Sequence, residues 1–167
     1  MNYLQGRNMI TGNPGVTRYP NAPRSDVIEA GNTFEDYVCD KLAEMGITLR
    51  TYKSSQFQLG TGENKIGFEI KLDNEHTKYN HLSIEVAERT RNDPSLRWTD
   101  SGILRNDNSW LYIQGNDELF WILFKPSLVY YYKNTHPITK DKFGTIRTFY
   151  LDYSEADKFG KRISRIR

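Results

Sequence analysis

Two short segments of the chain alternate strictly between apolar and polar residues. In residues 63–73 the even-numbered positions from 66 to 72 are apolar, and the odd-numbered positions are charged or glycine. Residues 82–89 repeat the pattern, with apolar residues at 82, 84 and 86. Since successive side chains of a strand point to opposite faces, both segments are predicted to be half-buried β-strands. We expect them to pair as a hairpin that places Glu69, Lys71 and Glu85 on one face.

A helical pattern precedes these strands. Residues 25–46 begin at a serine, carry apolar side chains at helical spacing between positions 34 and 45, and end at Gly46, which favours a helix C-terminus. Two capping boxes fit a helix start within this segment: Asn32 with Glu35, or Thr33 with Asp36. Either box places Glu35 and Asp36 in the first helical turn.

The rest of the chain contains apolar runs separated by turn signals, which predict further strands. These strands fall at residues 49–59, 110–114, 119–125 and 145–152. Residues 90–109 are polar and irregular, and predict a long loop. Pro126 favours a short helix after it, and the basic residues near the end of the sequence favour a last helix that begins near Ser154.

This order of elements predicts an α/β or α+β fold with a mixed central β-sheet flanked by helices. Residues 25–167 are expected to form one domain, because 167 residues are enough for a single core. Residues 1–24 lack periodicity and carry several glycines and prolines, so they predict an irregular N-terminal arm.

Composition bears on the cellular compartment of the protein and on the class of partner that it binds. The one cysteine, Cys39, excludes an internal disulfide and fits a reducing cytoplasm. No apolar run is long enough to predict a membrane span. The net charge of +2 is compatible with a nucleic-acid partner without demanding one.

The charged face of the predicted hairpin suits phosphodiester chemistry. Mg²⁺ prefers carboxylate oxygens, and Glu69 and Glu85 would supply them from adjacent strands. Lys71 would orient or deprotonate a water, or stabilise developing negative charge. Glu63 lies further along the same face, as an additional ligand or an orienting group. The competing interpretation is that a charged face of an antiparallel pair is simply the solvated face.

The predicted loop and its borders interleave basic residues with an aromatic one, a combination that suits a strand of nucleic acid. The candidate contacts are Arg89, Arg91, Arg97, Trp98 and Arg105. A surface loop held in place by Trp98 is the alternative.

A helix followed by strands that carry an acidic residue and then Glu-x-Lys resembles the core of the PD-(D/E)XK nuclease superfamily, the restriction-endonuclease-like fold. The likeness covers roughly residues 28–89. The sequence motif is similar to that of small phage and bacterial nuclease-like proteins of this superfamily. It reads Glu63-Asn64…Gly67…Glu69-Ile70-Lys71, followed by Ile84-Glu85-Val86. The resemblance implies one or two divalent metals, Mg²⁺ with Mn²⁺ as a substitute, held by the acids. It also implies that Glu35 matches a helix carboxylate found at such metal sites.

Two alignments with the superfamily remain open. One takes Glu63 as the first acid and Glu69-Ile70-Lys71 as the (D/E)XK element. The other takes Glu69 as the first acid and Glu85 as the second, so that Ala87 stands where a lysine is expected and Lys71 reaches across from the neighbouring strand. We favour the second, because the spacing between Glu69 and Glu85 fits two adjacent strands better.

We therefore expect a Mg²⁺-dependent DNA endonuclease in the cytoplasm of a bacterial cell or a phage-infected host. A chain of this size is small enough to act as a homodimer when it cuts both strands. The alternative is a catalytically inactive module of the same fold that binds nucleic acid or protein, which Ala87 and the modest net charge favour.

Overall fold

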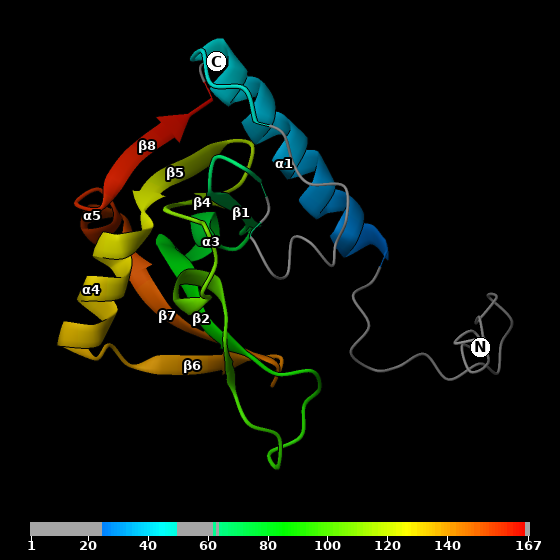
Figure 1. Cartoon of the computed structure of the whole chain (residues 1–167), viewed down its shortest axis with the longest axis vertical. Helices are drawn as coiled ribbons and strands as arrows, with labels where there is room; N and C mark the ends of the chain where they lie inside the picture. Colours follow the sequence, from blue (N-terminus) through cyan, green and yellow to red (C-terminus); the bar gives the residue numbers. More distant parts are fainter. Residues whose placement is uncertain (1–24, 50–61, 63, 166–167) are drawn as a thin grey trace, which may run out of the picture.

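The computed structural model describes residues 25–49, 62 and 64–165 (Figure 1). In this part of the chain the helices are α1 (Ser25–Glu44), α3 (His76–Tyr79), α4 (Lys125–Thr135) and α5 (Tyr153–Ala156), with a 3₁₀ turn η1 (Gly102–Leu104). The strands are β1 (Phe68–Leu72), β2 (His81–Glu88), β3 (Thr99–Asp100), β4 (Leu111–Gly115), β5 (Leu119–Phe124), β6 (Thr139–Lys142), β7 (Ile146–Asp152) and β8 (Gly160–Ser164). The fold is mixed α+β, in agreement with the predicted class, but its strands form two sheets where one central sheet was predicted.

Three predicted features lie outside the described residues. They are the N-terminal arm (1–24), Glu63, and the strand at 49–59 apart from Leu49. Among the helices that the structure describes, none combines the length and the apolar character that crossing a bilayer requires.

The strands form two four-stranded sheets, in the orders β1-β4-β5-β8 and β3-β2-β7-β6. β1 is parallel to β4, with Phe68 opposite Leu111, while the other pairs in both sheets are antiparallel. The predicted hairpin of β1 with β2 is wrong, because the two strands lie in different sheets. Alternation identifies a strand and its two faces, but contacts between distant parts of the sequence select its partner.

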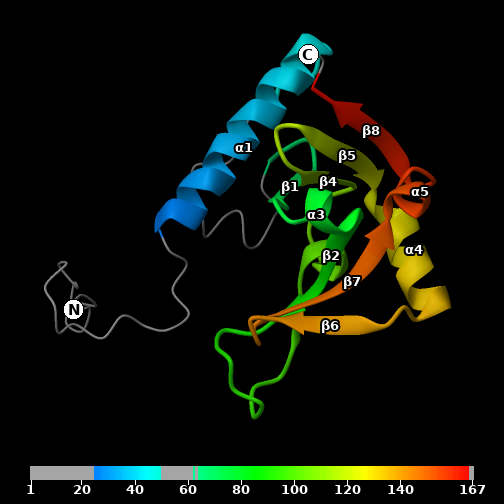
Figure 2. The same cartoon turned by 180° about the vertical axis from the view of Figure 1, so that it is seen from behind.

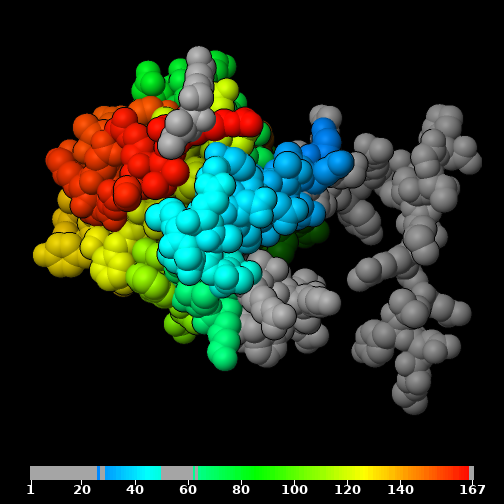
Figure 3. Space-filling view, turned by 90° about the horizontal axis from the view of Figure 1, so that it is seen from above, coloured from blue at the N-terminus to red at the C-terminus, as the bar shows by residue number. Residues whose placement is uncertain are grey.

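The first sheet is covered on both faces. On one face α1 contributes Phe34, Val38 and Leu42 to a buried cluster with Phe68 and Ile70 of β1. Figures 1 and 2 show α1 on the outer side of this sheet, and Figure 3 shows it as a ridge across one face of the molecule. The opposite face packs against the second sheet in a larger apolar core. The β1 residue between Phe68 and Ile70 therefore points away from α1, toward the second sheet.

α1 begins at Ser25, earlier than either predicted capping box requires. Thr33 lies inside the helix, where its hydroxyl donates a hydrogen bond to the carbonyl of Glu29 at 2.9 Å, one turn back. Both capping boxes are therefore wrong, and Glu35 lies in the middle of the helix instead of its first turn. A threonine inside a helix satisfies its hydroxyl in this way, so a cap-like sequence alone does not locate a helix start.

The second half of the chain follows most of its predicted order. β4 and β5 form the predicted hairpin, α4 begins at Lys125 with Pro126 in its first turn, and β7 covers the predicted last strand. The predicted last helix is wrong, because α5 ends at Ala156 and β8 then pairs with β5. β8 is basic and largely exposed, a composition common on edge strands that also resembles the basic end of a helix.

Candidate functional site

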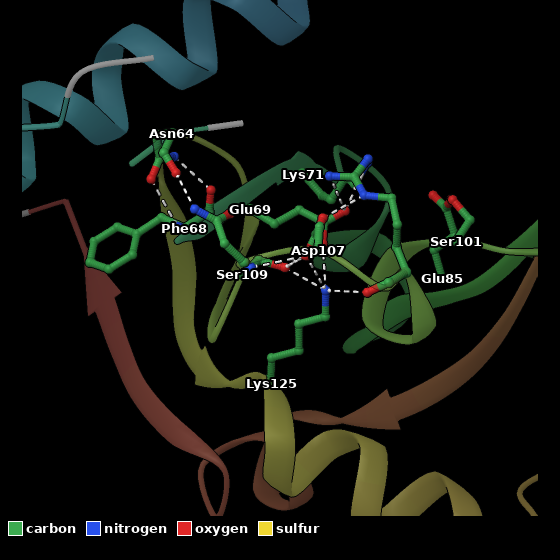
Figure 4. A network of polar contacts seen from close by, with 11 residues as sticks. Asn64, Phe68, Glu69, Lys71, Glu85, Ser101, Asp107, Ser109 and Lys125 are labelled. Carbon is green, nitrogen blue, oxygen red and sulfur yellow. Dashed lines mark hydrogen bonds and ion pairs between the residues drawn. The ribbon is translucent and has the colours of Figure 1, made fainter. Parts of the chain in front are cut away.

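Five charged side chains lie together beside β1 and form what we call the charged network: Glu69, Lys71, Arg105, Asp107 and Lys125 (Figure 4). Glu69 projects from β1 on the face opposite α1, and 0% of its side chain is exposed. Its Oε1 lies 3.3 Å from Nζ of Lys71 and 3.9 Å from a guanidinium nitrogen of Arg105. Its Oε2 lies 3.5 Å from Nζ of Lys125. A buried carboxylate requires such compensation, because removing it from water is unfavourable.

Lys125 joins the charged network to the start of α4. Its ammonium contacts four oxygen atoms: Asp107 Oδ1 at 3.1 Å, the Arg105 carbonyl at 3.2 Å, Glu69 Oε2 at 3.5 Å, and the Ser109 hydroxyl. Only 6% of its side chain is exposed. Its backbone N–H donates to the carbonyl of Trp110 at 2.9 Å, so both ends of Lys125 are held in place.

Asp107 is the second carboxylate of the network. Its Oδ2 lies 2.6 Å from Nε of Arg105, and its Oδ1 accepts hydrogen bonds from the backbone N–H of Ser109, at 2.9 Å, and from the hydroxyl of the same serine. Burial raises the pKa of Asp107, but the hydrogen bonds from Ser109, Arg105 and Lys125 outweigh it and lower this pKa to about 2. Asp107 is therefore ionised at every physiological pH.

The charged network has a formal charge of +1, since it contains two carboxylates and three cations. Both carboxylates are buried, whereas 29% of the Lys71 side chain and 21% of the Arg105 side chain are exposed. Lys71 and Arg105 therefore meet solvent, whereas Lys125 and both carboxylates are covered. Such an arrangement attracts anions.

Glu85 is not placed beside Glu69 in the way the sequence predicts. It lies on β2 in the second sheet, and its carboxylate accepts a hydrogen bond from the hydroxyl of Ser101. Figure 4 shows Glu85 and Ser101 to one side of the charged network. The single hairpin face that would have combined Glu69, Lys71 and Glu85 does not exist, because β1 pairs with β4 instead of β2.

Glu35, the predicted helix ligand, projects from the middle of α1. Burial raises the pKa of its carboxyl group, and the positive charge of Lys71 offsets part of this increase. Glu35 is therefore within electrostatic range of the charged network. A carboxyl group with a raised pKa is a better proton acceptor near neutral pH.

The described side chains do not fit the predicted Mg²⁺ site. Across residues 25–49, 62 and 64–165, no three His, Cys, Asp or Glu side chains gather into a group that could hold a metal ion. Glu69 and Asp107 are the two carboxylates of the network, and the ammonium of Lys125 lies between them. Lys71 and Arg105 add two more positive charges within 4 Å of Glu69. A divalent cation would be repelled by these groups as they lie.

The predicted nucleic-acid contacts are divided between two places. Arg89 and Arg147 both contact the ring of Trp98, with guanidinium carbons 4.5 and 4.2 Å from its centroid. Arg89 also donates from Nε to the carbonyl of Gly144 at 2.6 Å. Trp98 thus packs against two arginines of the same chain, and these contacts hold the loop against β7.

Arg91 and Arg97 remain on the surface of the loop. Arg91 lies 3.5 Å from Asp93, and Arg97 lines an open groove of about 470 Å³ with Glu88, Arg89 and Leu96. Arg105, predicted to accompany them, belongs instead to the charged network.

Sequence reasoning missed three members or neighbours of the network: Asp107, Ser109 and Lys125. Asp107 and Ser109 lie in a segment without periodicity, although their spacing of two is that of an Asx turn. Lys125 carries the clearest signal in the sequence. A lysine at the first position of a helix opposes the helix dipole, so its position needs another explanation.

Comparisons with known proteins identify no relative, since no family model, no curated protein and no solved structure matches this chain. Fold and site together define a mixed α+β protein with a buried ionic network, two of whose three cations, Lys71 and Arg105, reach the surface. The resemblance to the PD-(D/E)XK superfamily stays a prediction.

Proposed function

We propose that this chain hydrolyses phosphodiester bonds in nucleic acid and acts as a DNA endonuclease. One observation carries the proposal: the charged network has a net positive charge, and its two partly exposed members, Lys71 and Arg105, lie next to the buried carboxylate of Glu69. A phosphodiester is an anion, and lysine and arginine are the side chains that bind it.

A bound phosphate group would contact Lys71 and Arg105 first, because these are the cations that solvent reaches. The planar guanidinium of Arg105 is itself oriented by the hydrogen bond from its Nε to Asp107, which restricts the directions from which a phosphate can approach it. The transition state of hydrolysis carries more negative charge on its oxygens than the ground state. The same cations therefore stabilise the transition state preferentially.

Hydrolysis also requires a proton acceptor for the attacking water and a proton donor for the leaving oxygen. We assign the acceptor role to Glu35, which lies within electrostatic range of Lys71 and whose pKa is raised by burial. As the water oxygen bonds to phosphorus, its proton passes to Glu35; as the bond to the leaving oxygen breaks, that oxygen takes a proton from Lys71. Mg²⁺, the predicted cofactor, would supply charge neutralisation and water activation when bound. No step is assigned to it, because the described side chains do not fit it.

Cleavage of supercoiled plasmid by the full chain tests the proposal. The assay compares wild type with Lys71→Met, Arg105→Gln and Glu35→Gln, each with Mg²⁺ and with EDTA. We expect each substitution to lower the rate by about 100-fold or more. Lys158→Met is the matched control, because Lys158 forms an exposed ion pair with Glu155 on α5. Equal trace nicking by wild type and all variants would identify a contaminant and reject the proposal.

A second candidate function is binding of nucleic acid or protein without catalysis. It is favoured by Glu69, whose carboxylate is already engaged by three cations of the same chain, and by Ala87 at the position where a lysine is expected. Fluorescence anisotropy with labelled duplex DNA, single-stranded DNA and RNA distinguishes the two functions. Salt-dependent binding that Lys71→Met weakens, without cleavage under any metal condition, would establish the binding module.

A further inference from the structure

The ammonium of Lys125 is held by oxygen atoms of four different groups, which we call the oxygen cage. The cage consists of Glu69 Oε2, Asp107 Oδ1, the Arg105 carbonyl and the Ser109 hydroxyl. Two carboxylates, a carbonyl and a hydroxyl around one small cation are the ligand types that proteins offer to Mg²⁺, Mn²⁺ or Ca²⁺.

The other cations of the network do not use the same carboxylate oxygens. Lys71 and Arg105 face Oε1 of Glu69, and Nε of Arg105 faces Oδ2 of Asp107. Lys125 faces Oε2 and Oδ1. Each carboxylate therefore directs one oxygen into the cage and the other toward the more exposed cations, so the cage is a distinct cation site inside the network.

The position of Lys125 at the start of α4 directs its side chain toward the oxygen cage. As the first residue of α4, its charge is disfavoured by the helix dipole. Pro126 sets the start of the helix, and the hydrogen bond from the Lys125 N–H to the Trp110 carbonyl ties that start to the residue before β4. The side chain points into the oxygen cage, where its ammonium is compensated (Figure 4).

We propose that the oxygen cage has the ligand chemistry of a divalent-cation site. The ammonium of Lys125, a group of the chain itself, occupies the position that the metal ion would take. Wild type then takes up no divalent metal between Glu69 and Asp107. Shortening Lys125 leaves two buried carboxylates directed at an open space and creates a site for Mn²⁺, Mg²⁺ or Ca²⁺. The inference goes beyond the proposed function, because it holds whether or not the chain cleaves DNA.

Calorimetric titration of the full chain with MnCl₂, without nucleic acid, tests this inference. Lys125→Ala is expected to bind one Mn²⁺ per chain and to gain thermal stability from it. The double variant Lys125→Ala/Asp107→Asn should lose that binding, because it lacks one of the two cage carboxylates. Lys158→Ala is the matched control, and it should behave as wild type, since its ammonium pairs with Glu155 at the surface.

Three results would overturn the inference. The first is a folded Lys125→Ala, cooperative in thermal unfolding, that binds no Mn²⁺ at millimolar concentration. The second is Mn²⁺ binding by Lys125→Ala that persists unchanged in the double variant. The third is Mn²⁺ binding by wild type that Asp107→Asn abolishes. Where Lys125→Ala does not fold alone, recovery of its fold by Mn²⁺ supports the inference and failure to recover rejects it.

Discussion

The carboxylate of Glu69 lies 3.5 Å from the ammonium nitrogen of Lys125, although the two residues are 56 positions apart in the chain. Both side chains are buried, so each contributes to the charge compensation that the other requires, together with Lys71 beside Glu69 and Asp107 beside Lys125. This pair connects β1 to the start of α4. We therefore expect the loss of either side chain to lower the stability of the fold, whatever its effect on activity.

Replacing Lys125 by methionine is expected to lower the free energy of unfolding by about 3–5 kcal/mol, because it leaves the Glu69 and Asp107 carboxylates buried with one cation fewer. Adding Glu69→Gln should restore part of the loss, since it removes one of the uncompensated charges. Urea denaturation measures both effects. The exposed-pair control, Lys158→Met, should change stability by less than about 1 kcal/mol. Equal effects of Lys125→Met and Lys158→Met would show that the buried network does not stabilise the fold.

The acid stability of the chain should depend on Asp107. Its pKa of about 2 lies below the ordinary value of 3.8, so the folded state favours the ionised form. The resulting stabilisation, about 2–3 kcal/mol, is fully present above about pH 4 and is lost as pH falls toward 2. Asp107→Asn lacks this contribution. The difference in stability between wild type and Asp107→Asn should therefore shrink between about pH 5 and pH 2, and a constant difference would contradict the assignment.

His76 should make stability depend on pH in a higher range. Its ring is buried, with Nδ1 2.7 Å from the hydroxyl of Tyr153, and burial lowers its pKa below the ordinary 6.5. The neutral ring is therefore favoured in the folded state. Its stabilisation is present above about pH 6.5 and is lost as pH falls below that value.

Denaturant titrations between about pH 7 and pH 5 test this role of His76. Stability of wild type should fall more steeply with acidification than stability of His76→Gln. His136 is a suitable control, because it is exposed at the left-handed end of α4, and His136→Asn suits that backbone conformation. A slope that His136→Asn removes and His76→Gln leaves intact would reverse the assignment.

Two glycines should respond to alanine with opposite signs. Gly102, at the start of η1, has φ +51°, and a Cβ there would collide with the carbonyl and the Cβ of Glu85. Gly102→Ala is expected to destabilise the fold by about 2 kcal/mol or more. Gly31 lies inside α1 with no atom within 4 Å of a new Cβ, so Gly31→Ala should stabilise by about 0.5–1 kcal/mol. Thermal unfolding of the two variants provides the comparison.

Local patterns in the sequence predicted several elements, although not the start of α1 or the last helix, and β1 begins at Phe68, later than the strand predicted at 63–73. The period of 3.6 in α1, the period of two in β1 and β2, and the turn between β4 and β5 depend on neighbouring residues alone. The choice of β4 as the partner of β1, in contrast, depends on residues far away in the sequence. The charged face of β1 suggested an exposed hairpin, but Glu69 is buried because cations from two other segments compensate its charge. Compensation between segments leaves no periodic trace in the sequence.

The candidate site was predicted only in part, because only some of its contacts lie within one segment of the sequence. Glu69 and Lys71 were found because they are two residues apart on a patterned strand, and they do form an ion pair at 3.3 Å. Asp107 and Lys125 were missed because one lies in an irregular loop and the other at a helix start. Glu85 was placed wrongly, because its predicted position depended on a register between strands that belong to different sheets.

The parallel pairing of β1 with β4 determines when the network can assemble. β1 does not pair with the strand that follows it in the sequence but with β4, more than 40 residues later. The Glu69 carboxylate contacts Lys125 only when β5 and the start of α4 are also in place. Closing such long loops costs entropy before any contact compensates it, so we expect these contacts to form late in folding. Until then Glu69, Asp107 and their cations remain hydrated. A chain released before α4 is synthesised would carry β1 without the ammonium that permits its glutamate to be buried.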